Sequence, residues 1–333
     1  MESETRGRIF LGIVALAAAF TATAATIPSP YRPTASASAA AVLAAEGQEG
    51  LDLDARALAS LRAGGKVLEV EGFPLAPGAS GKLRLTRFEV ATPDAKMTIR
   101  GTDGERTLPV PSVTHYSGIV EGETDSSVYL GLADDGLVAY VHSSLGHAYV
   151  GPNEEKTGFV VRLGDSPLNA RASRSSFHCP SEELPAALTA MAEPIAAPAP
   201  AAPMVAGFKQ ALVRVETDNQ LYQFFGNDPG NLTVYVLRLF GAINVIYDRD
   251  LAMHLSVNEI HMWSSADPYT GGDTFTQLMQ LGDWWHANKP MSSNPRTMVH
   301  YLSGHPVSGG IAWLGVLCSG DFPNGSDWGG GYG

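Results

Sequence analysis

The sequence predicts an α+β or α/β protein with an N-terminal antiparallel β domain, a linker, and a domain whose mostly parallel sheet has an antiparallel edge strand. Residues 66–162 alternate apolar and polar side chains and carry Gly and Asp turns, as antiparallel strands do. Residues 184–203, LPAALTAMAEPIAAPAPAAP, are rich in Pro and Ala and are typical of an extended spacer. After them, strand and helix patterns follow in the order β-α-β-α-β-β, which favours an α/β layer.

The N-terminus has the pattern of a secretory signal peptide. Arg6 and Arg8 precede an apolar run from Ile9 to Phe20, and small residues follow at 22–24. The run is shorter than the roughly 20 residues of a membrane-spanning helix. We therefore expect residues 1–25 to be a signal peptide, and the rest of the chain to be secreted without a membrane partner.

The bulk composition limits the classes of partner. The chain is 44% hydrophobic and 17% charged, with a net charge of -12. This acidic balance argues against nucleic acid or an anionic membrane surface as a partner. Two cysteines in 333 residues are too few for a disulfide scaffold.

In the N-terminal part, Leu51 to Arg62 places apolar residues at helical spacing and predicts a short helix. Asp103-Gly104 is a hairpin turn signal. The clearest hairpin runs from Val128 to Val141, with two apolar runs on either side of an Asp-Asp-Gly turn at 134–136.

In the C-terminal part, two helices have clear start signals. Asp228-Pro229 is an N-cap followed by a first-turn proline, and Asp273 caps a second helix that ends near Lys289. Strands are predicted around these helices at residues 210–217, 255–263, 297–302 and 311–317.

Residues 308–333, SGGIAWLGVLCSGDFPNGSDWGGGYG, resemble the edge strand of the reprolysin-like (adamalysin-type, metzincin) zinc metalloproteases. In that family a Gly-x-Ala-aromatic-x-Gly strand ends in a Cys shortly before the zinc helix, and Gly310–Gly315 and Cys318 match this pattern. The helix carries His-Glu-x-x-His-x-x-Gly-x-x-His, which the printed sequence does not contain. The resemblance implies a precursor truncated before its zinc helix, which we expect to be inactive as given and to bind no zinc.

Residues 115–141, HYSGIVEGETDSSVYLGLADDGLVAYV, resemble the pro-domain of the same family. The resemblance implies a pro-domain over 26–183. The composition of residues 27–50, rich in Ala, Ser and Pro, predicts that its start is disordered. A Pro/Ala linker would follow at 184–205, and the first part of the catalytic domain at 206–333. The competing interpretation is a secreted, non-enzymatic β-rich binding or adhesion protein.

The family's edge strand binds an extended peptide as an additional strand. The matching positions are Gly310, Ile311, Ala312, Trp313 and Leu314, which implies a peptide or protein substrate. Plain strand packing is the alternative for each position, and core packing for Trp313. No catalytic residue can be assigned.

Cys179 and Cys318 leave three possibilities open. In the family, a cysteine near the end of the pro-domain ligates the active-site zinc and keeps the enzyme latent, since a thiolate displaces the reactive water. Cys179 is the candidate for this switch in the latent full-length form. It could instead form a disulfide with Cys318 or remain a free thiol. In the family, the cysteine that matches Cys318 forms a disulfide with a cysteine beyond the zinc motif. This favours the switch role for Cys179.

Overall fold

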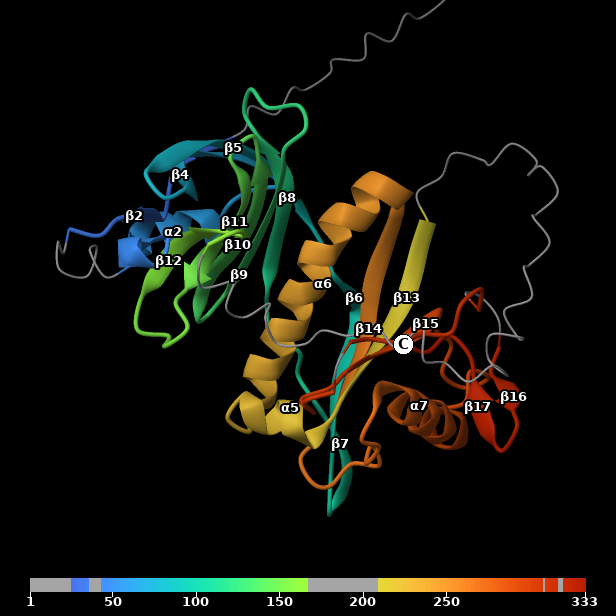
Figure 1. Ribbon diagram of the computed structural model, residues 1–333. Helices are drawn as coiled ribbons and strands as arrows, with labels where there is room; N and C mark the ends of the chain where they lie inside the picture. Colours follow the sequence, from blue (N-terminus) through green and yellow to red (C-terminus); the bar gives the residue numbers. More distant parts are fainter. Residues whose placement is uncertain (1–24, 36–42, 167–208, 308, 317–319) are drawn as a thin grey trace, which may run out of the picture.

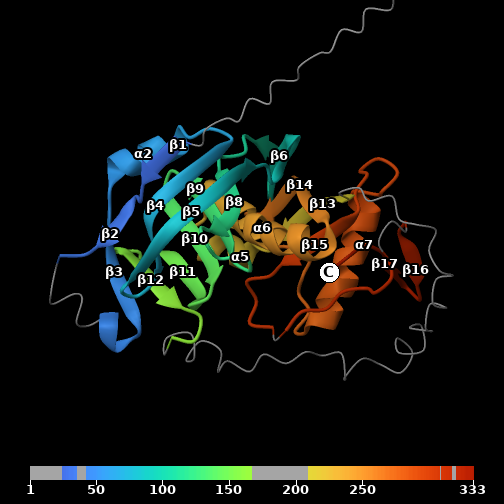
Figure 2. The same cartoon turned by 90° about the horizontal axis from the view of Figure 1, so that it is seen from above.

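The computed structural model describes residues 25–35, 43–166, 209–307, 309–316 and 320–333. They form two large sheets with a long helix between them (Figure 1), and one small two-stranded sheet. The view from above shows the same succession, with a further helix, α7, on the far side of the second sheet (Figure 2). We call the two the N-terminal sheet and the C-terminal sheet.

The N-terminal sheet has ten strands among the described residues, in the order β1-β4-β5-β8-β9-β10-β11-β12-β3-β2. All neighbours are antiparallel except β1 and β4. The antiparallel strands expected in residues 66–162 are thus present in this sheet, apart from residues 91–108, which lie in the other one. The sheet curls until β12 and β2 contact β4, enclosing an apolar core. Its strands are β1 (Ala25–Pro28), β2 (Tyr31–Pro33), β3 (Gln48–Leu53), β4 (Val67–Ala76), β5 (Ala79–Phe88), β8 (Thr114–Val120), β9 (Ser127–Ala133), β10 (Gly136–Ser143), β11 (Gly146–Pro152) and β12 (Phe159–Leu163).

Two expectations for the N-terminal part need correction. Residues 27–50 were expected to be disordered, but β1, β2 and the start of β3 lie there, because Ile27 and Tyr31 are buried and Tyr31 Oη donates to the Leu137 carbonyl at 2.7 Å. The helix predicted from Leu51 is shorter. Helix α2 (Ala55–Arg62) begins after Asp54, whose carboxylate accepts the backbone N–H groups of the first turn.

The C-terminal sheet has the order β15-β13-β14-β6-β7. Its strands are β13 (Lys209–Thr217), β14 (Met253–Trp263), β15 (Met298–Leu302), β6 (Ala91–Gly101) and β7 (Gly104–Leu108). The pairs β13–β14, β13–β15 and β14–β6 are parallel, and β6–β7 is an antiparallel hairpin. The sheet is therefore mostly parallel, as predicted. Strands β6 and β7, however, come from the middle of the N-terminal part of the sequence.

The antiparallel edge strand is a different segment from the one predicted. Residues 311–316 form no strand, and β7 holds the antiparallel edge instead. Gly309 and Gly315 have φ angles of +82° and +71°, in the left-handed region that interrupts an extended backbone. Between these two glycines, Trp313 N–H donates to the Tyr332 carbonyl at 3.2 Å.

Helix α6 (Pro229–Leu251) joins the two sheets (Figure 1). It contacts β14 and β6 on one side and β8 and β9 on the other. The predicted cap is confirmed, because the Asp228 carboxylate accepts from the N–H groups of Gly230 and Asn231 and Pro229 opens the helix. The other predicted helix, α7 (Thr274–Asn288), is likewise capped by Asp273. A short helix α5 (Asn219–Phe224) and a small hairpin of β16 (Phe322–Asn324) and β17 (Asp327–Gly329) complete the elements.

Helix α6 is also long and apolar enough to cross a membrane by length and composition alone. In this fold it is a core helix. Leu232, Val236 and Phe240 are buried, and Arg238 pairs through two hydrogen bonds with Asp135 of the N-terminal sheet, at 2.9 and 2.7 Å.

Helix α6 packs tightly against the N-terminal sheet at Gly241. A Cβ atom there would lie 2.5 Å from Tyr129 Cε2 and 2.8 Å from His115 Nδ1. Both rings are buried, and they contact each other at 3.0 Å between His115 Nδ1 and Tyr129 Oη. Burial lowers the pKa of His115 to about 3, so the ring stays neutral beneath the helix.

Gly241→Ala should therefore destabilise the protein by about 1–3 kcal/mol through overpacking. The same change in an unconstrained helix interior would stabilise it by about 0.5–1 kcal/mol. Urea unfolding of the full chain measures whether Gly241→Ala lowers or raises the free energy of unfolding. Ile246→Ala, at a half-exposed position of α6, is the control and should change stability by less than about 0.5 kcal/mol. A stabilised Gly241→Ala variant would contradict this packing.

Candidate functional site

The predicted substrate segment, Gly310 to Leu314, lies beside the last residues of the chain. Tyr301 N–H donates to the Gly333 carbonyl at 2.7 Å, and Val299 N–H donates to the Gly331 carbonyl at the same distance. Residues 330–333 thus run next to β15, and Trp313 bonds to Tyr332 on their other side. The segment lies at the β15 end of the C-terminal sheet, opposite the β6–β7 hairpin.

Within the segment, side chains differ in environment. Ile311 and Trp313 pack against the apolar cluster that includes Trp285 and Tyr332, and Trp313 contacts the ring of Phe322. Leu314, in contrast, is 85% exposed. Packing in this apolar cluster therefore explains the positions of Ile311 and Trp313, but not that of Leu314. Its binding of substrate stays a prediction.

Asp218 connects the residues that precede this segment to the end of β13 by hydrogen bonds. It follows β13 directly and is fully buried. Its carboxylate caps α5 through Leu221 N–H at 2.7 Å and accepts from Ser303 Oγ at 2.6 Å and Tyr301 Oη at 3.1 Å. Gly304 N–H is a further donor. Sequence analysis missed this residue, although a carboxylate at the carboxyl end of a parallel strand is a usable signal.

A second buried carboxylate, Glu216, lies two residues earlier on β13. It accepts from Trp263 Nε1 at 2.6 Å and from Trp285 Nε1 at 3.1 Å. His261 Nδ1 lies 2.8 Å from Glu216 Oε2. These donors satisfy a charge that would otherwise be too costly to bury.

The β6–β7 hairpin completes the surroundings of His261. Glu105, on β7, places its carboxylate 3.3 Å from His261 Nε2 and 3.3 Å from Lys289 Nζ. Lys289 Nζ in turn donates to Glu259 at 2.6 Å, and Arg214 pairs with the same carboxylate. Three carboxylates thus face three cationic side chains. We call Glu105, Glu216, Glu259, His261, Lys289 and Arg214 the ionic cluster.

The cluster shifts the protonation equilibria of its members. Burial favours neutral His261, but the charge of Glu216 and the contact with Glu105 outweigh it and raise the pKa. The His261 contact, followed by Lys289, lowers the pKa of Glu105 to about 2. For Glu259, burial opposes ionisation, but Lys289 and Arg214 still hold the pKa below its usual value. The arrangement is suited to holding ionised groups inside the protein.

The described residues do not supply a zinc site. No group of three or more His, Cys, Asp or Glu side chains among them could hold a metal ion. Each nitrogen of the His261 ring already faces a carboxylate. Cys179 and Cys318, the candidates for the switch and the disulfide, lie outside the described residues.

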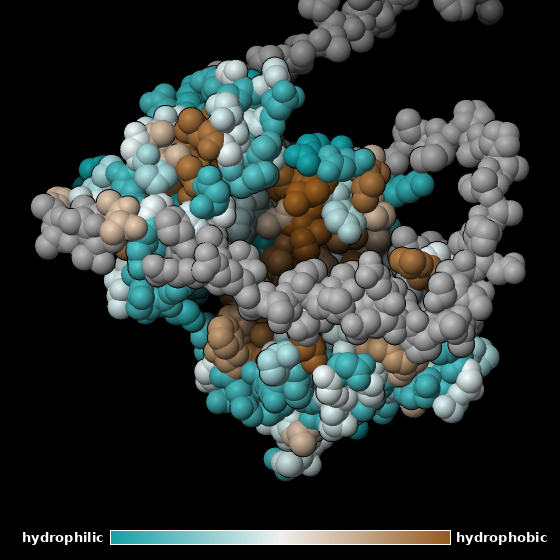
Figure 3. Space-filling model, viewed as in Figure 1, coloured by the Kyte–Doolittle hydropathy of each residue, from teal (hydrophilic) through white to brown (hydrophobic). Residues whose placement is uncertain are grey.

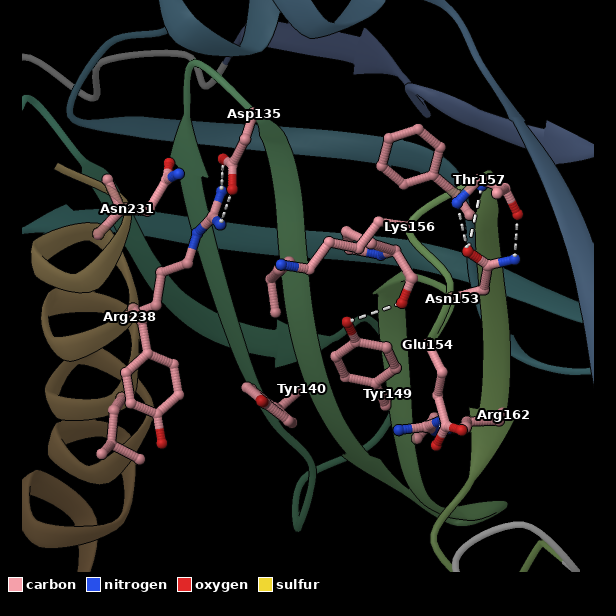
Figure 4. A pocket seen from close by; sticks show the side chains of 18 of the residues that line it. Asp135, Tyr140, Tyr149, Asn153, Glu154, Lys156, Thr157, Arg162, Asn231 and Arg238 are labelled. Carbon is pink, nitrogen blue, oxygen red and sulfur yellow. Dashed lines mark hydrogen bonds and ion pairs between the residues drawn. The ribbon is translucent and has the colours of Figure 1, made fainter. Parts of the chain in front are cut away.

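A separate pocket of about 1070 Å³ lies between the N-terminal sheet and helices α5 and α6. Figure 4 shows Tyr140, Tyr149 and Arg162 along its sheet side and Arg238 on α6. The Arg162 guanidinium lies 4.8 Å from the centre of the Tyr149 ring, and its Nε has no hydrogen-bond partner among the described residues. The pocket combines aromatic surface with two arginines that each pair with an acidic side chain, Arg238 with Asp135 and Arg162 with Glu154. Sequence analysis did not identify this pocket.

Apolar side chains also gather on the surface near the middle of the face seen in Figure 3. Four large apolar side chains on α5 and α6 are exposed, namely Phe224, Tyr235, Ile246 and Leu251. Phe224 and Tyr235 also line the pocket.

Comparison with known proteins finds relatives of the C-terminal part. Residues 209–331 match the Reprolysin_5 model of metallo-peptidase family M12. A mouse (Mus musculus) protein, "a disintegrin and metallopeptidase domain 3", is 26% identical over 116 residues, which is 34% of this chain and 14% of that protein. These matches confirm the resemblance to the reprolysin-like metalloproteases.

The sequence match covers a small part of the relative, and the structural similarity is low. The matched segment spans about one seventh of the mouse protein's length. Metalloproteinase-II from Bacteroides fragilis aligns over 74% of this chain and 68% of its own, with 7% identity and a TM-score of 0.34, which is too low to establish a common fold.

The raised pKa of His261 predicts a pH dependence of stability. A group whose pKa is higher in the folded state stabilises the fold fully below its unfolded pKa, here about 6.5, and loses this effect as pH rises through the folded value. The groups facing His261 are Glu216 on β13, Glu105 on β7 and Lys289 after α7. Wild type should therefore lose more stability than His261→Gln between pH 6 and pH 9.

Urea unfolding at the two pH values measures this difference. At pH 6, His261→Gln should cost about 3 kcal/mol, because it removes a partner from a buried ion pair. The exposed His147, changed to Gln, is the matched control and should leave the pH profile unchanged. Equal losses of stability between pH 6 and pH 9 for wild type and His261→Gln would refute a raised pKa of His261 in the folded state.

Proposed function

We propose that this chain is the precursor of a secreted zinc metalloendopeptidase, which hydrolyses peptide bonds in protein substrates. The match of residues 209–331 to the M12 metallopeptidases carries this proposal. Residues 206–333 would supply the first part of the catalytic domain, residues 26–183 the pro-domain and residues 184–205 the linker cut during maturation. The N-terminal signal pattern supports secretion.

The described residues would act on the substrate by positioning it. An extended peptide would lie along the segment from Gly310 to Leu314. Exposed Leu314 would face it, while the packed Trp313 side chain would hold the segment's backbone in place. Asp218 would fix the preceding turn at Ser303 and Gly304.

The family is zinc-dependent in general, and its zinc supplies the Lewis acid for hydrolysis. The described residues do not fit that metal, so we assign no catalytic step to them.

A second candidate function is non-enzymatic binding by the β-rich N-terminal part. The pocket between the N-terminal sheet and α6 favours it, since aromatic rings and the Arg162 guanidinium converge there. Such concave, mostly apolar sites with a few polar groups are typical of ligand binding.

Determining the coding sequence beyond the codon for Gly333 tests the enzyme proposal. We expect an open frame encoding His-Glu-x-x-His-x-x-Gly-x-x-His. The encoded protein, once its N-terminal part is removed, should then cleave a protein substrate in a chelator-sensitive manner. Changing the glutamate of that motif to glutamine should abolish cleavage. An immediate stop codon would overturn the proposal and leave binding as the remaining function.

A further inference from the structure

The pocket between the N-terminal sheet and helices α5 and α6 has aromatic side chains on both walls. On the sheet side, the ring centres of Tyr140 and Tyr149 lie 5.6 Å apart, and Arg162 lies beside Tyr149 (Figure 4). On the helix side, the ring centres of Phe225 and Tyr235 lie 4.9 Å apart. Two aromatic walls of this kind can bury apolar side chains placed between them.

Part of this aromatic surface faces solvent. Phe224, Tyr140 and Tyr235 all line the pocket, and they are 77%, 46% and 40% exposed. An exposed apolar patch beside a pocket is typical of a surface that another peptide segment covers.

The charged side chains of the pocket lining leave one positive charge in excess, with histidine counted as neutral. Three are cationic and two are carboxylates, namely Lys156, Arg162, Arg238, Asp135 and Glu154. Arg238 pairs with Asp135 at 2.7 Å. Arg162 lies 3.8 Å from Glu154, and its Nε has no hydrogen-bond partner among the described residues. The lining therefore suits an apolar ligand with a single negative charge.

The chain itself contains a segment of this composition at residues 184–195, LPAALTAMAEPI. The segment lies outside the residues that the structure describes. Its large apolar side chains recur every three or four residues, as do the anchors of peptides that dock in apolar grooves, and they are Leu184, Leu188, Met191 and Ile195. Glu193 is its only charged residue.

The connections on both sides of this segment are long enough for it to reach the pocket. Gly164, the residue after β12, lines the pocket, so the chain leaves the N-terminal sheet there. It re-enters at Lys209, whose N–H donates to the Ala252 carbonyl at 2.9 Å, just after α6. From Tyr235 to Ala252 the helix spans about 25 Å, and residues 196–208 can extend to about 45 Å.

We propose that residues 184–195 bind in the pocket between the N-terminal sheet and α6, as a ligand that the chain supplies to itself. Their apolar side chains contact the two aromatic walls, and Glu193 pairs with Arg162. An external ligand of the pocket then competes with this segment. The inference rests on the second proposed function, binding at this pocket, and is independent of peptidase activity.

The test uses the full chain with residues 184–195 replaced by an equal length of Gly and Ser. The probe is a fluorescently labelled synthetic peptide of residues 184–195, and fluorescence anisotropy measures its dissociation constant. We expect the replaced chain to bind the peptide with a dissociation constant below about 100 μM, because a tethered copy at an effective concentration of about 1 mM then fills the pocket. The wild-type chain should for the same reason bind the peptide about tenfold more weakly or worse. No binding to the replaced chain, or equal affinity for the two chains, would overturn the proposal.

Phe224→Ala, made in the replaced chain, places the peptide in the pocket. It removes a mostly exposed pocket side chain and should raise the dissociation constant about fivefold or more. Leu251→Ala, at an exposed position of α6 outside the pocket lining, is the matched control and should change it less than about twofold. Near-UV circular dichroism establishes that both variants are folded. Equal effects of the two substitutions would contradict binding at the pocket.

The pairing of Glu193 with Arg162 is tested by a double-mutant cycle. A peptide with Glu193→Gln should bind the replaced chain more weakly than the original peptide does. The two peptides should bind equally to the replaced chain that also carries Arg162→Gln. The same weakening in both chains would refute this pair.

A dye distinguishes the occupant from the pocket. The apolar anion 8-anilinonaphthalene-1-sulfonate should fluoresce with the replaced chain, less so with its Phe224→Ala variant, and the peptide should displace it. Dye binding without displacement would overturn the proposed occupant but leave a ligand pocket. Absence of both dye and peptide binding would overturn the second proposed function as well. A dimer of the replaced chain that binds no peptide would assign the surface to a second copy instead.

Discussion

The burial of two carboxylates, Glu216 and Glu259, is the constraint on which the C-terminal sheet depends. Neither has exposed surface, and an unpaired charge at such a depth would cost several kcal/mol. Glu216 draws its partners from β14 and α7, whereas Glu259 receives Thr98 from β6 as well as Lys289 and Arg214. The N-terminal hairpin is thus part of the set of partners that makes these carboxylates tolerable.

The two edges of the C-terminal sheet therefore have different neighbours. At one end, β6 and β7 cover the edge of β14 with a segment from the N-terminal part. At the other, residues 310–314, the predicted substrate segment, lie beside residues 330–333. The β6–β7 hairpin and the predicted substrate segment therefore lie at opposite edges of the sheet.

Sequence patterns identified the elements with local signals. Asp228-Pro229 and Asp273 marked the starts of α6 and α7 because capping depends on neighbouring residues. The placement of β6 could not be predicted, since the alternation in Met97 to Arg100 suits either sheet and its partner, β14, lies about 160 residues away in sequence. The ionic cluster escaped notice for the same reason. Its members come from four segments, namely β7, β13, β14 and the end of α7, which only the fold brings together.

Hydrogen exchange of the intact chain tests most directly whether the N-terminal hairpin is a structural strand of the C-terminal sheet. The amides of residues 97–100 in β6 and 259–263 in β14 should exchange as slowly as those of β13, because opening any of them requires opening the shared sheet. Fast exchange in β6 and β14, with β13 still protected, would show that the hairpin is not part of the sheet and would contradict the account.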